Sequence, residues 1–353
     1  MTLPILEKFK IALNGRRPPL PKREVESLEE QAFIDQSRKT LEELEIIRLT
    51  KLKMFEFRKK IGIAGATILI PLTGYIDYWL IFLSGSDSDG AGLSVIMLGA
   101  IYWWVTGPKR QYAKSYKIEI LPKLAKLFGN FEYGIDYKIP IETMQPSQIV
   151  PAHDRYKSED YFKGTYKGID IEFSEIDLQQ RRRSKNRTYY VSIFKGLAIL
   201  LDMQRKKFYG HTILDMNKGK LGEWFKEKSV KLKRARMVDP EFEKIFDAYT
   251  NDQVEARYLI DPVMIERLKG LYKEYNGEKM TVAYFENKVL ILIASPYNHF
   301  EPADIYTPAT DTQSLLNMKH EIAGILSIID KLDFYDPQEL HRQSAKNNEA
   351  ENA

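Results

Sequence analysis

The chain has 353 residues, with 53 Lys and Arg against 49 Asp and Glu, and a hydrophobic fraction of 44%. These values are typical of a globular protein of about two domains, so they exclude a wholly disordered or fibrous chain. The sequence contains no Cys, which excludes a disulfide framework, a Cys-ligated metal site and thiol catalysis. The net charge of +4 is too small to indicate a nucleic-acid-binding protein.

The N-terminal region is mostly polar and divides into two parts. Residues 1–26 include the basic, proline-rich run Arg16–Arg23, which predicts a flexible basic arm with an extended stretch. Residues 27–60 lack Pro and Gly, and their apolar side chains recur at helical spacing, which predicts an amphipathic helix. Three partners for its apolar face stay open: the inner leaflet, the C-terminal domain or a second copy.

Two apolar runs follow, and they predict a transmembrane hairpin. Residues 61–83 carry one charge, Asp77, and reach about 34 Å as a helix, enough for a hydrocarbon core of about 30 Å. Residues 91–106 carry no charge, and the connection 84–90 holds two Asp and no base. Basic residues precede the first run and follow the second. Because basic flanks stay in the cytoplasm, we expect a two-pass protein with an external loop and both termini cytoplasmic.

Aromatic residues near the ends of these runs fit interfacial belts, with Tyr75, Tyr78 and Trp79 outside and residues 102–104 inside. We interpret Asp77 as an interfacial carboxylate that reaches headgroup water. The alternative is an ion or proton path, since ionisable groups inside membranes often have that role. A buried core hairpin of a soluble protein is the alternative to the whole membrane interpretation.

Residues 110–335 predict a cytoplasmic domain. Period-2 patterns indicate strands over 161–176 and 188–201, joined by a polar loop over 179–187. Later segments predict short strands within 208–214 and 242–249, a helix starting at Asp261-Pro262, a hairpin of 280–285 and 289–294, and a helix over 312–332. Clustered strands with flanking helices indicate an α+β fold with an antiparallel sheet. Residues 336–353 are polar, and we expect a disordered tail.

Two basic clusters stand out in this domain as candidate lipid or anion contacts: Arg181, Arg182, Arg183, Lys185 and Arg187, and then Lys231, Lys233 and Arg234. Beneath a membrane, each base near the surface contributes about 1 kcal/mol of attraction to anionic headgroups. The alternatives are a solvated surface, an acidic protein partner or nucleic acid; we do not expect nucleic acid.

The sequence carries no recognised catalytic signature: it lacks the nucleophile elbow, the phosphate-binding loop and the dinucleotide fingerprint. Its five His are scattered without metal-ligand spacing, so neither a metal nor a cofactor is expected. If the protein is an enzyme, its pocket is expected around Asp160, Tyr166, Glu175 and Arg257. We interpret Glu175 as solvated, and Arg257 as a structural partner of Glu243 or Glu255 rather than an anion ligand.

One block of the chain contains several short motifs: Glu159-Asp160-Tyr161, Phe194-Lys195-Gly196, Asp239-Pro240-Glu241-Phe242, Asp261-Pro262 and Asn298-x-Phe300-Glu301-Pro302. Together they resemble the conserved block of a bacterial membrane-protein family known only as a domain of unknown function. The resemblance covers about residues 110–335. It implies a bacterial origin, two membrane helices ahead of the block and a place in the inner membrane, but no activity, ligand or catalytic residue.

These observations predict a membrane-anchored cytoplasmic binding or scaffolding module. Its expected partners are the lipid bilayer, anionic headgroups, an unidentified protein and, as a homo-oligomer, other copies of itself. The alternatives are a membrane-bound enzyme of unrecognised type and an accessory subunit of a transporter that uses Asp77.

Overall fold

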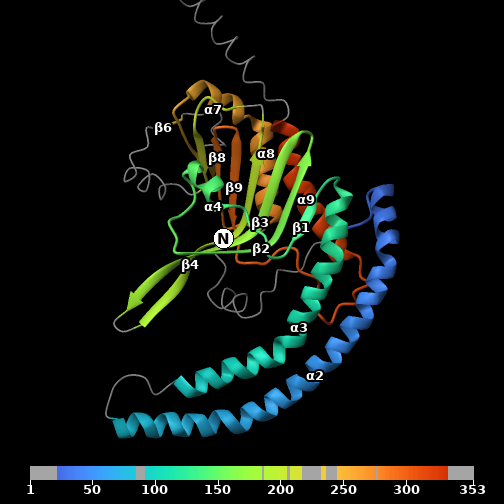
Figure 1. Ribbon diagram of the computed structural model, residues 1–353, viewed down its shortest axis with the longest axis vertical. Helices are drawn as coiled ribbons and strands as arrows, with labels where there is room; N and C mark the ends of the chain where they lie inside the picture. The colour runs from blue at the N-terminus through green and yellow to red at the C-terminus, as the bar shows by residue number, and fades with distance from the viewer. Residues whose placement is uncertain are drawn as a thin grey trace, which may run out of the picture. The chain divides into compact units, whose positions relative to one another are not determined.

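The computed structural model describes residues 22–84, 92–184, 187–204, 207–216, 232–235, 245–275 and 277–332. The chain divides into two compact units (Figure 1). The helical unit comprises Glu24–Leu121 and Glu301–Leu315, and the sheet unit contains Pro122–Phe300 and the residues from Leu316 onward. Most of the predicted basic arm, the predicted external loop and the predicted C-terminal tail lie outside the described residues.

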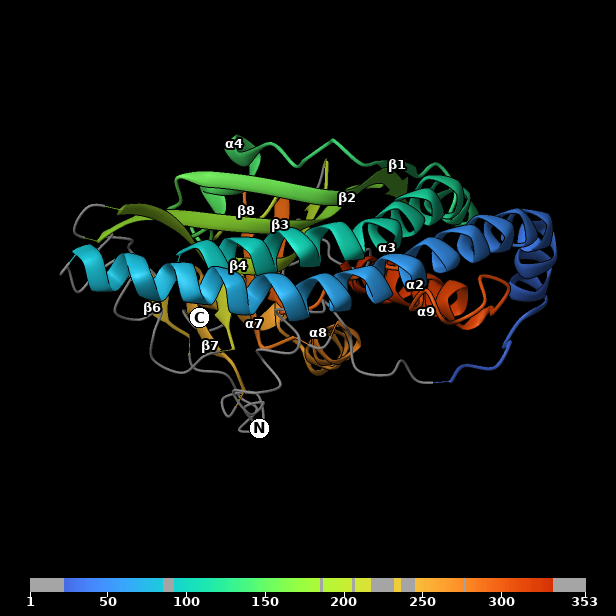
Figure 2. The same ribbon diagram turned by 90° about the horizontal axis from the view of Figure 1, so that it is seen from below.

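Two long helices, α2 (Leu28–Ser84) and α3 (Gly92–Leu127), run side by side in opposite directions (Figures 1 and 2). The predicted amphipathic helix and the first apolar run are therefore one continuous helix, which passes through Pro71. The second apolar run continues through Pro108 as the same helix, which ends at Leu127. A helix tolerates Pro where neighbouring helices support the freed backbone groups.

The polar half of α2 is joined to the segment Glu301–Leu315 of the same unit. Arg48 forms an ion pair of 2.6 Å with Glu45 and donates to the backbone oxygen of Ile305 at 2.6 Å. Glu45 also accepts the backbone N–H of Ala309 at 2.7 Å. The sequence left open whether this helix packs on the inner leaflet, on the C-terminal domain or on a second copy. In the structure, part of its surface packs on the segment Glu301–Leu315 of the same chain.

Asp77 connects the apolar halves of α2 and α3. Its carboxylate accepts the backbone N–H of Ser94 at 3.0 Å and that of Leu93 at 3.3 Å, and the Ser94 hydroxyl donates to it at 2.7 Å. The side chain is buried. The first N–H groups of a helix lack partners within it, and a carboxylate satisfies them well. Asp77 therefore caps α3. We had expected a carboxylate that reaches headgroup water, but the side chain is buried between the two helices.

Among the described residues, the sheet unit is built on nine antiparallel strands in the order β1-β2-β3-β4-β9-β8-β5-β7-β6 (Figure 1). This confirms the predicted α+β class. The strands are β1 (Glu132–Gly134), β2 (Arg155–Tyr166), β3 (Ile169–Ser184), β4 (Arg187–Asp202), β5 (Thr212–Asp215), β6 (Lys233–Arg234), β7 (Asp247–Thr250), β8 (Lys279–Phe285) and β9 (Lys288–Ala294).

Two strand predictions were wrong in detail. The single strand expected over 161–176 is the hairpin of β2 and β3, which turns at Lys167 and Gly168, with φ of 49° and 76°. A two-residue turn interrupts the alternation of apolar and polar residues very little, so the sequence pattern did not indicate the turn. The polar loop expected over 179–187 is mostly strand, because β3 extends to Ser184 and β4 starts at Arg187.

Other predictions are confirmed. Helix α8 (Pro262–Glu274) starts at Asp261, whose side chain accepts the N–H of Met264 at 2.8 Å. The predicted hairpin is β8 and β9, and the predicted last helix is α9 (Gln313–Leu332). The described residues also contain three short helices: α4 (Ile141–Met144), η1 (Gln145–Ser147) and α7 (Gln253–Leu259).

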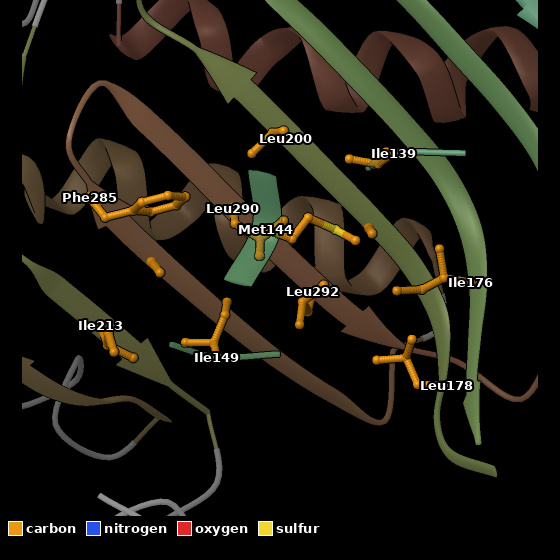
Figure 3. Close-up of a cluster of buried hydrophobic side chains, with 12 residues drawn as sticks. Ile139, Met144, Ile149, Ile176, Leu178, Leu200, Ile213, Phe285, Leu290 and Leu292 are labelled. Carbon is orange, nitrogen blue, oxygen red and sulfur yellow. The ribbon is translucent and has the colours of Figure 1, made fainter. Parts of the chain in front are cut away.

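Both faces of the sheet are covered. On one face, Ile139, Met144 and Ile149 from the α4 region lie over the sheet, where Figure 3 shows them among Ile176, Leu178, Leu200, Ile213, Phe285, Leu290 and Leu292. Helices α8 and α9 lie on the opposite face (Figures 1 and 2). Each buried side chain of this size contributes about 1.5–3 kcal/mol, so the two apolar layers stabilise the sheet.

A close backbone contact marks the point where the sheet narrows. β4 pairs with β9 from Asp202 to Gly196, and β9 ends two residues past Leu292 at Ala294. Gly196 has φ of 151°, and a Cβ there would lie 2.0 Å from the backbone oxygen of Ile293. Beyond it, β3 and β4 continue as a two-stranded projection, residues 179–184 and 187–194, which we name the arginine ribbon.

Replacing Gly196 by Ala should destabilise the sheet unit by at least about 2–3 kcal/mol, because a side chain would collide with the backbone of β9. Gly270, inside α8 with open space around it, is the matched control. Gly270→Ala should stabilise the protein by about 0.5–1 kcal/mol. Thermal unfolding of the detergent-solubilised chain measures both, and equal midpoints for the two variants would contradict the predicted contact.

Candidate functional site

The arginine ribbon pairs each of two arginines with a tyrosine. Arg181 lies opposite Tyr190, and Arg182 lies opposite Tyr189. Successive residues of a strand point to opposite faces, so each face of the ribbon presents arginine beside tyrosine. Tyr189 and Tyr190 are 49% and 41% exposed. The Arg155 guanidinium stacks 3.8 Å from the centroid of the Tyr190 ring.

The ribbon is strongly basic. No Asp or Glu occurs between residues 178 and 195. Arg181, Arg182 and Arg183 are exposed, and in the part of the chain that the structure describes their guanidinium groups form no ion pair. Asp154, at the base of the ribbon, accepts the backbone N–H of Arg181 at 2.7 Å. The ribbon therefore offers unneutralised guanidinium groups together with aromatic rings.

Other predicted contact residues fit this role less well or were not described. Lys185 and Lys231 lie outside the described residues, as does the side chain of Arg187. Lys233 is exposed on β6, while Arg234 pairs with Asp247 at 2.7 Å. An arginine that already has a carboxylate partner attracts a second anion less strongly. The first predicted cluster is therefore the better candidate surface.

A cavity of about 140 Å³ lies at the base of the ribbon, on the face of the sheet that α8 and α9 cover. Charged residues from three neighbouring strands line it in two rows. In one row, Lys157, Asp177 and Lys195 lie side by side on β2, β3 and β4. In the next row, Glu159 lies directly opposite Glu175. Ser158, Ile176, Gly196, Tyr297 and Asn298 complete the lining.

Most of these charges are not neutralised by one another. Among the described residues, Lys157, Lys195 and Glu159 form no ion pair within 4.0 Å. Asp177 accepts a hydrogen bond from Gln179 with Oδ2, whereas its Oδ1 is buried and has no hydrogen-bond partner among the described residues. Leaving such an oxygen unpaired costs about 1–3 kcal/mol.

Glu175, at the inner side of the cavity, is held by the loop that follows β9. It accepts the backbone N–H of His299, and its side chain is buried. The prediction that Glu175 is solvated was therefore wrong. Glu172 and Glu175 lie on opposite faces of β3, as the alternation of side chains along a strand predicts. Glu172 accepts the hydroxyl of Tyr161 at 2.7 Å.

Behind this loop, His299 connects three elements. Its Nε2 lies 3.1 Å from Ser295 Oγ, its Nδ1 lies 3.7 Å from Glu321 Oε1, and its ring centroid lies 4.7 Å from that of Tyr275. A serine, an imidazole and a carboxylate in this order resemble a nucleophile with its base. However, Ser295 is 2% exposed and does not line the cavity, so no substrate reaches its hydroxyl in this conformation. The arrangement is a buried structural network.

The four residues predicted for an enzyme pocket do not come together. Asp160 is buried at a bulge in β2 and accepts the hydroxyl of Tyr133 at 2.6 Å. Tyr166 lies at the far end of β2, and Arg257 is exposed on α7. Only Glu175 lines the cavity. Of the predicted partners of Arg257, Glu255 accepts the backbone N–H groups of Tyr209 and Gly210, and Glu243 lies outside the described residues.

Sequence reasoning missed the other charged lining residues. Lys157 and Asp177 are brought together by the β2–β3 hairpin, which was not predicted. One signal was available: Glu159 and Lys195 both belong to the short motifs singled out in the sequence. A correct β2–β3 hairpin would have placed Glu159 opposite Glu175.

Comparison with known proteins finds similarity to one family model and no activity. A family model described as "Protein of unknown function (DUF3137)" matches residues 192–334, which run from within β4 to the end of α9. This match confirms the resemblance to an uncharacterised family. No curated protein matches.

Among solved structures, the crystal structure of the mycobacterial trehalose monomycolate transport factor A, TtfA, is similar. The sequences are 10% identical, the TM-score is 0.27, and the match covers 59% of this chain and 93% of that chain. At this TM-score and identity, the likeness supports no statement about function.

Replacing Glu175 by Ala should cost about 2 kcal/mol of unfolding free energy, because the His299 N–H would be left without its acceptor inside the protein. Glu175→Gln keeps an acceptor oxygen and should cost less than about 1 kcal/mol. Amide hydrogen exchange of the 295–300 loop measures the effect, with replacement of the exposed Glu142 on α4 by Ala as the control. Equal protection of the loop in all three variants would show that Glu175 does not hold it.

Proposed function

We propose that this protein is a membrane-anchored binding module of the bacterial inner membrane. In this proposal α2 and α3 cross the bilayer as a hairpin with both termini in the cytoplasm. The sheet unit contacts anionic lipid headgroups through the arginine ribbon. The expected protein partner and self-association remain predictions.

The surface of the two helices supports the membrane anchor. Within Leu28–Trp79, α2 is long and apolar enough to cross a membrane, the only helix of the described residues that is. Exposed large apolar side chains concentrate on both helices in the two apolar runs: Ile61, Ile63, Ile68, Leu72, Ile76 and Trp79 on α2, and Leu93, Val95, Ile96, Leu98 and Trp103 on α3. A soluble protein rarely leaves so continuous an apolar surface in water, whereas a bilayer would cover it.

The contacts at one end of these runs fit the inner interface. The guanidinium of Arg58 lies 5.1 Å from the ring centroid of Trp104 and donates to its backbone oxygen at 3.0 Å. Arg110 makes the same pair of contacts with Trp103, at 5.1 Å and 2.7 Å. Tryptophan beside arginine is typical of the headgroup region on the cytoplasmic side. Near the opposite end Asp77 caps α3, and the sequence there has no Lys or Arg.

The ribbon supports lipid contact for three reasons. Its free guanidinium groups attract phosphate, with about 1 kcal/mol for each base near an anionic surface. Its exposed tyrosines have an apolar body and a polar tip, which suits the interface between headgroups and water. A tether to the membrane also raises the local concentration of headgroups around the sheet unit, so weak single contacts suffice. Free nucleic acid would have no such advantage.

Hydrogen exchange of the full chain in nanodiscs tests the lipid contact. The ribbon's outward-facing amides should exchange more slowly in discs rich in phosphatidylglycerol than in phosphatidylcholine discs. Replacing Arg181, Arg182, Arg183 and Arg187 by Glu should abolish this difference, because the attraction becomes repulsion. High salt should reduce it in the unmodified protein, since salt screens exposed charges.

The matched control reverses four exposed bases elsewhere on the sheet unit: Lys126, Lys138, Lys207 and Arg257. This variant has the same net charge as the ribbon variant and should keep the protection. If the unmodified ribbon exchanges at the same rate in both kinds of disc, the lipid contact is refuted. If the control variant also loses the slower exchange, the net charge of the protein, and not the ribbon, determines the lipid contact.

A further inference from the structure

We infer that the open edge of β4 in the arginine ribbon binds an extended acidic segment of a partner protein as an added β-strand. The inference rests on the proposed role as a binding module and names its protein partner by chemistry. It does not depend on the lipid contact. Headgroups would be bound by the side chains of the ribbon, whereas an added strand pairs with its backbone.

The edge of β4 is open along the ribbon. β9 pairs with β4 as far as Gly196, and beyond that pair the Lys195 oxygen accepts the Ser295 N–H at 2.9 Å. Among the described residues, no strand pairs with this side of residues 187–194. Figure 1 shows this part of β4 extending together with β3 beyond β9. An open edge presents unpaired N–H and C=O groups with which another chain can pair.

Hydrogen bonds at the base of the ribbon show which backbone groups of β4 face this edge. The Gln179 oxygen accepts the Asp154 N–H at 2.9 Å, and the Arg181 N–H donates to the Asp154 carboxylate at 2.7 Å. Both β3 residues therefore direct their backbone groups away from β4. Ser192 and Tyr190 lie directly opposite them. In an antiparallel pair, two such opposed residues both turn their backbone groups outward, so those of Ser192 and Tyr190 face the open edge.

The edge lacks the devices that usually protect an open strand. Residues 188–194 read TYYVSIF, which is rich in β-branched and aromatic residues and contains no charge, Pro or Gly. Residues 188–192 are exposed. The pairing of β3 with β4 is irregular only at the base of the ribbon, between Leu178 and Gln179. Native proteins block open edges with charges, Pro, bulges or a covering loop, so an unblocked strand of high β-propensity is suited to accept another strand.

The charge of the neighbouring strand selects an acidic occupant. The exposed arginines of β3, residues 181–183, lie one strand away from the edge and two strands away from an occupant. An arginine side chain covers that distance in this sheet: Arg155 lies on β2, and its guanidinium stacks 3.8 Å from the ring of Tyr190 on β4. The three arginines alternate between the two faces of the ribbon. Carboxylates on either face of an added strand would therefore find a guanidinium group.

A second copy of the chain fits the edge less well. Two ribbons paired edge to edge would bring together two segments that each contain five Lys and Arg and no Asp or Glu between residues 179 and 194. Like charges this close repel and disfavour the pairing. An acidic strand replaces this repulsion by attraction, while its backbone supplies most of the affinity, as in other cases of strand addition.

Peptide binding to the full chain in phosphatidylcholine nanodiscs tests the inference. The probe is a short fluorescent peptide that alternates glutamate and valine, and fluorescence anisotropy measures its affinity. One control peptide has lysine in place of glutamate. The other keeps glutamate but has a methyl group on every backbone nitrogen, so it cannot donate to a strand. We expect the acidic peptide to bind at least about tenfold more tightly than either control.

Variants test the edge and the charge separately. Ser192→Pro removes an outward N–H but no bond to β3, and it should weaken binding of the acidic peptide by about tenfold. Replacing Arg181, Arg182, Arg183 and Arg187 by Glu should reverse the preference, so that the lysine peptide binds more tightly. The control variant with the same net charge should keep the original preference; it reverses Lys126, Lys138, Lys207 and Arg257. Unchanged unfolding midpoints show that each variant is folded, and the methylated peptide tests backbone pairing without any change in the protein.

Amide hydrogen exchange locates the bound peptide. The amides of Tyr190 and Ser192 should exchange more slowly when the acidic peptide is bound. Phosphatidylcholine discs contain no anionic lipid, so this result is independent of whether the ribbon contacts anionic headgroups.

Several outcomes would overturn the inference. If the methylated peptide binds as tightly as the acidic one, or if Ser192→Pro leaves the affinity unchanged, charge alone attracts the peptide and no strand is added. If the lysine peptide binds equally well, or neither peptide binds at millimolar concentration, the edge does not recognise an acidic strand. Slower exchange of the two amides at higher protein concentration without peptide would assign the edge to a second copy. Slower exchange in phosphatidylglycerol discs but not with peptide would assign it to lipid.

Discussion

The close approach of β4 to β9 at Gly196 determines the rest of the sheet unit. Because the backbones pass so near that no side chain fits, β9 ends there and the chain leaves the sheet as the 295–300 loop. The partners β3 and β4 continue without it and become the arginine ribbon. The cavity lies in the corner that this divergence leaves, with Glu175 held by the departing loop. The ribbon, the cavity and the buried histidine network therefore lie next to this one backbone contact.

Stability and recognition are separated along the same strands. Within the nine-stranded part, β3 and β4 bury apolar side chains on both faces and contribute to the core. Beyond the junction they bury little, and arginine and tyrosine replace isoleucine and leucine. Changes at the exposed ribbon residues should therefore affect binding more than folding, because they lie outside the core, whereas Ile193 and Phe194 at the base of the ribbon pack against it.

The sequence was most informative where one physical signal dominated. The charge and hydropathy of residues 61–106 predicted the helical pair, and the Asp261-Pro262 start and the Glu286-Asn287 turn predicted α8 and the β8–β9 hairpin. The prediction from sequence failed where one pattern fits two structures. Arg181–Arg183 read as a loop because polar residues are common in loops, yet each is paired in a ladder. The cavity could not be predicted, because it depends on a register between β2 and β3 that the turn at Lys167-Gly168 hid.

The membrane anchor is the central claim, since it places the ribbon and the cavity beneath a bilayer. Because the chain has no Cys, single cysteines report its topology directly. A membrane-impermeant thiol reagent should label Ser88→Cys in intact bacterial cells, and it should label Lys138→Cys only after the cells are permeabilised. Protection of Ser88→Cys in intact cells, or labelling of Lys138→Cys before permeabilisation, would contradict the two-pass anchor.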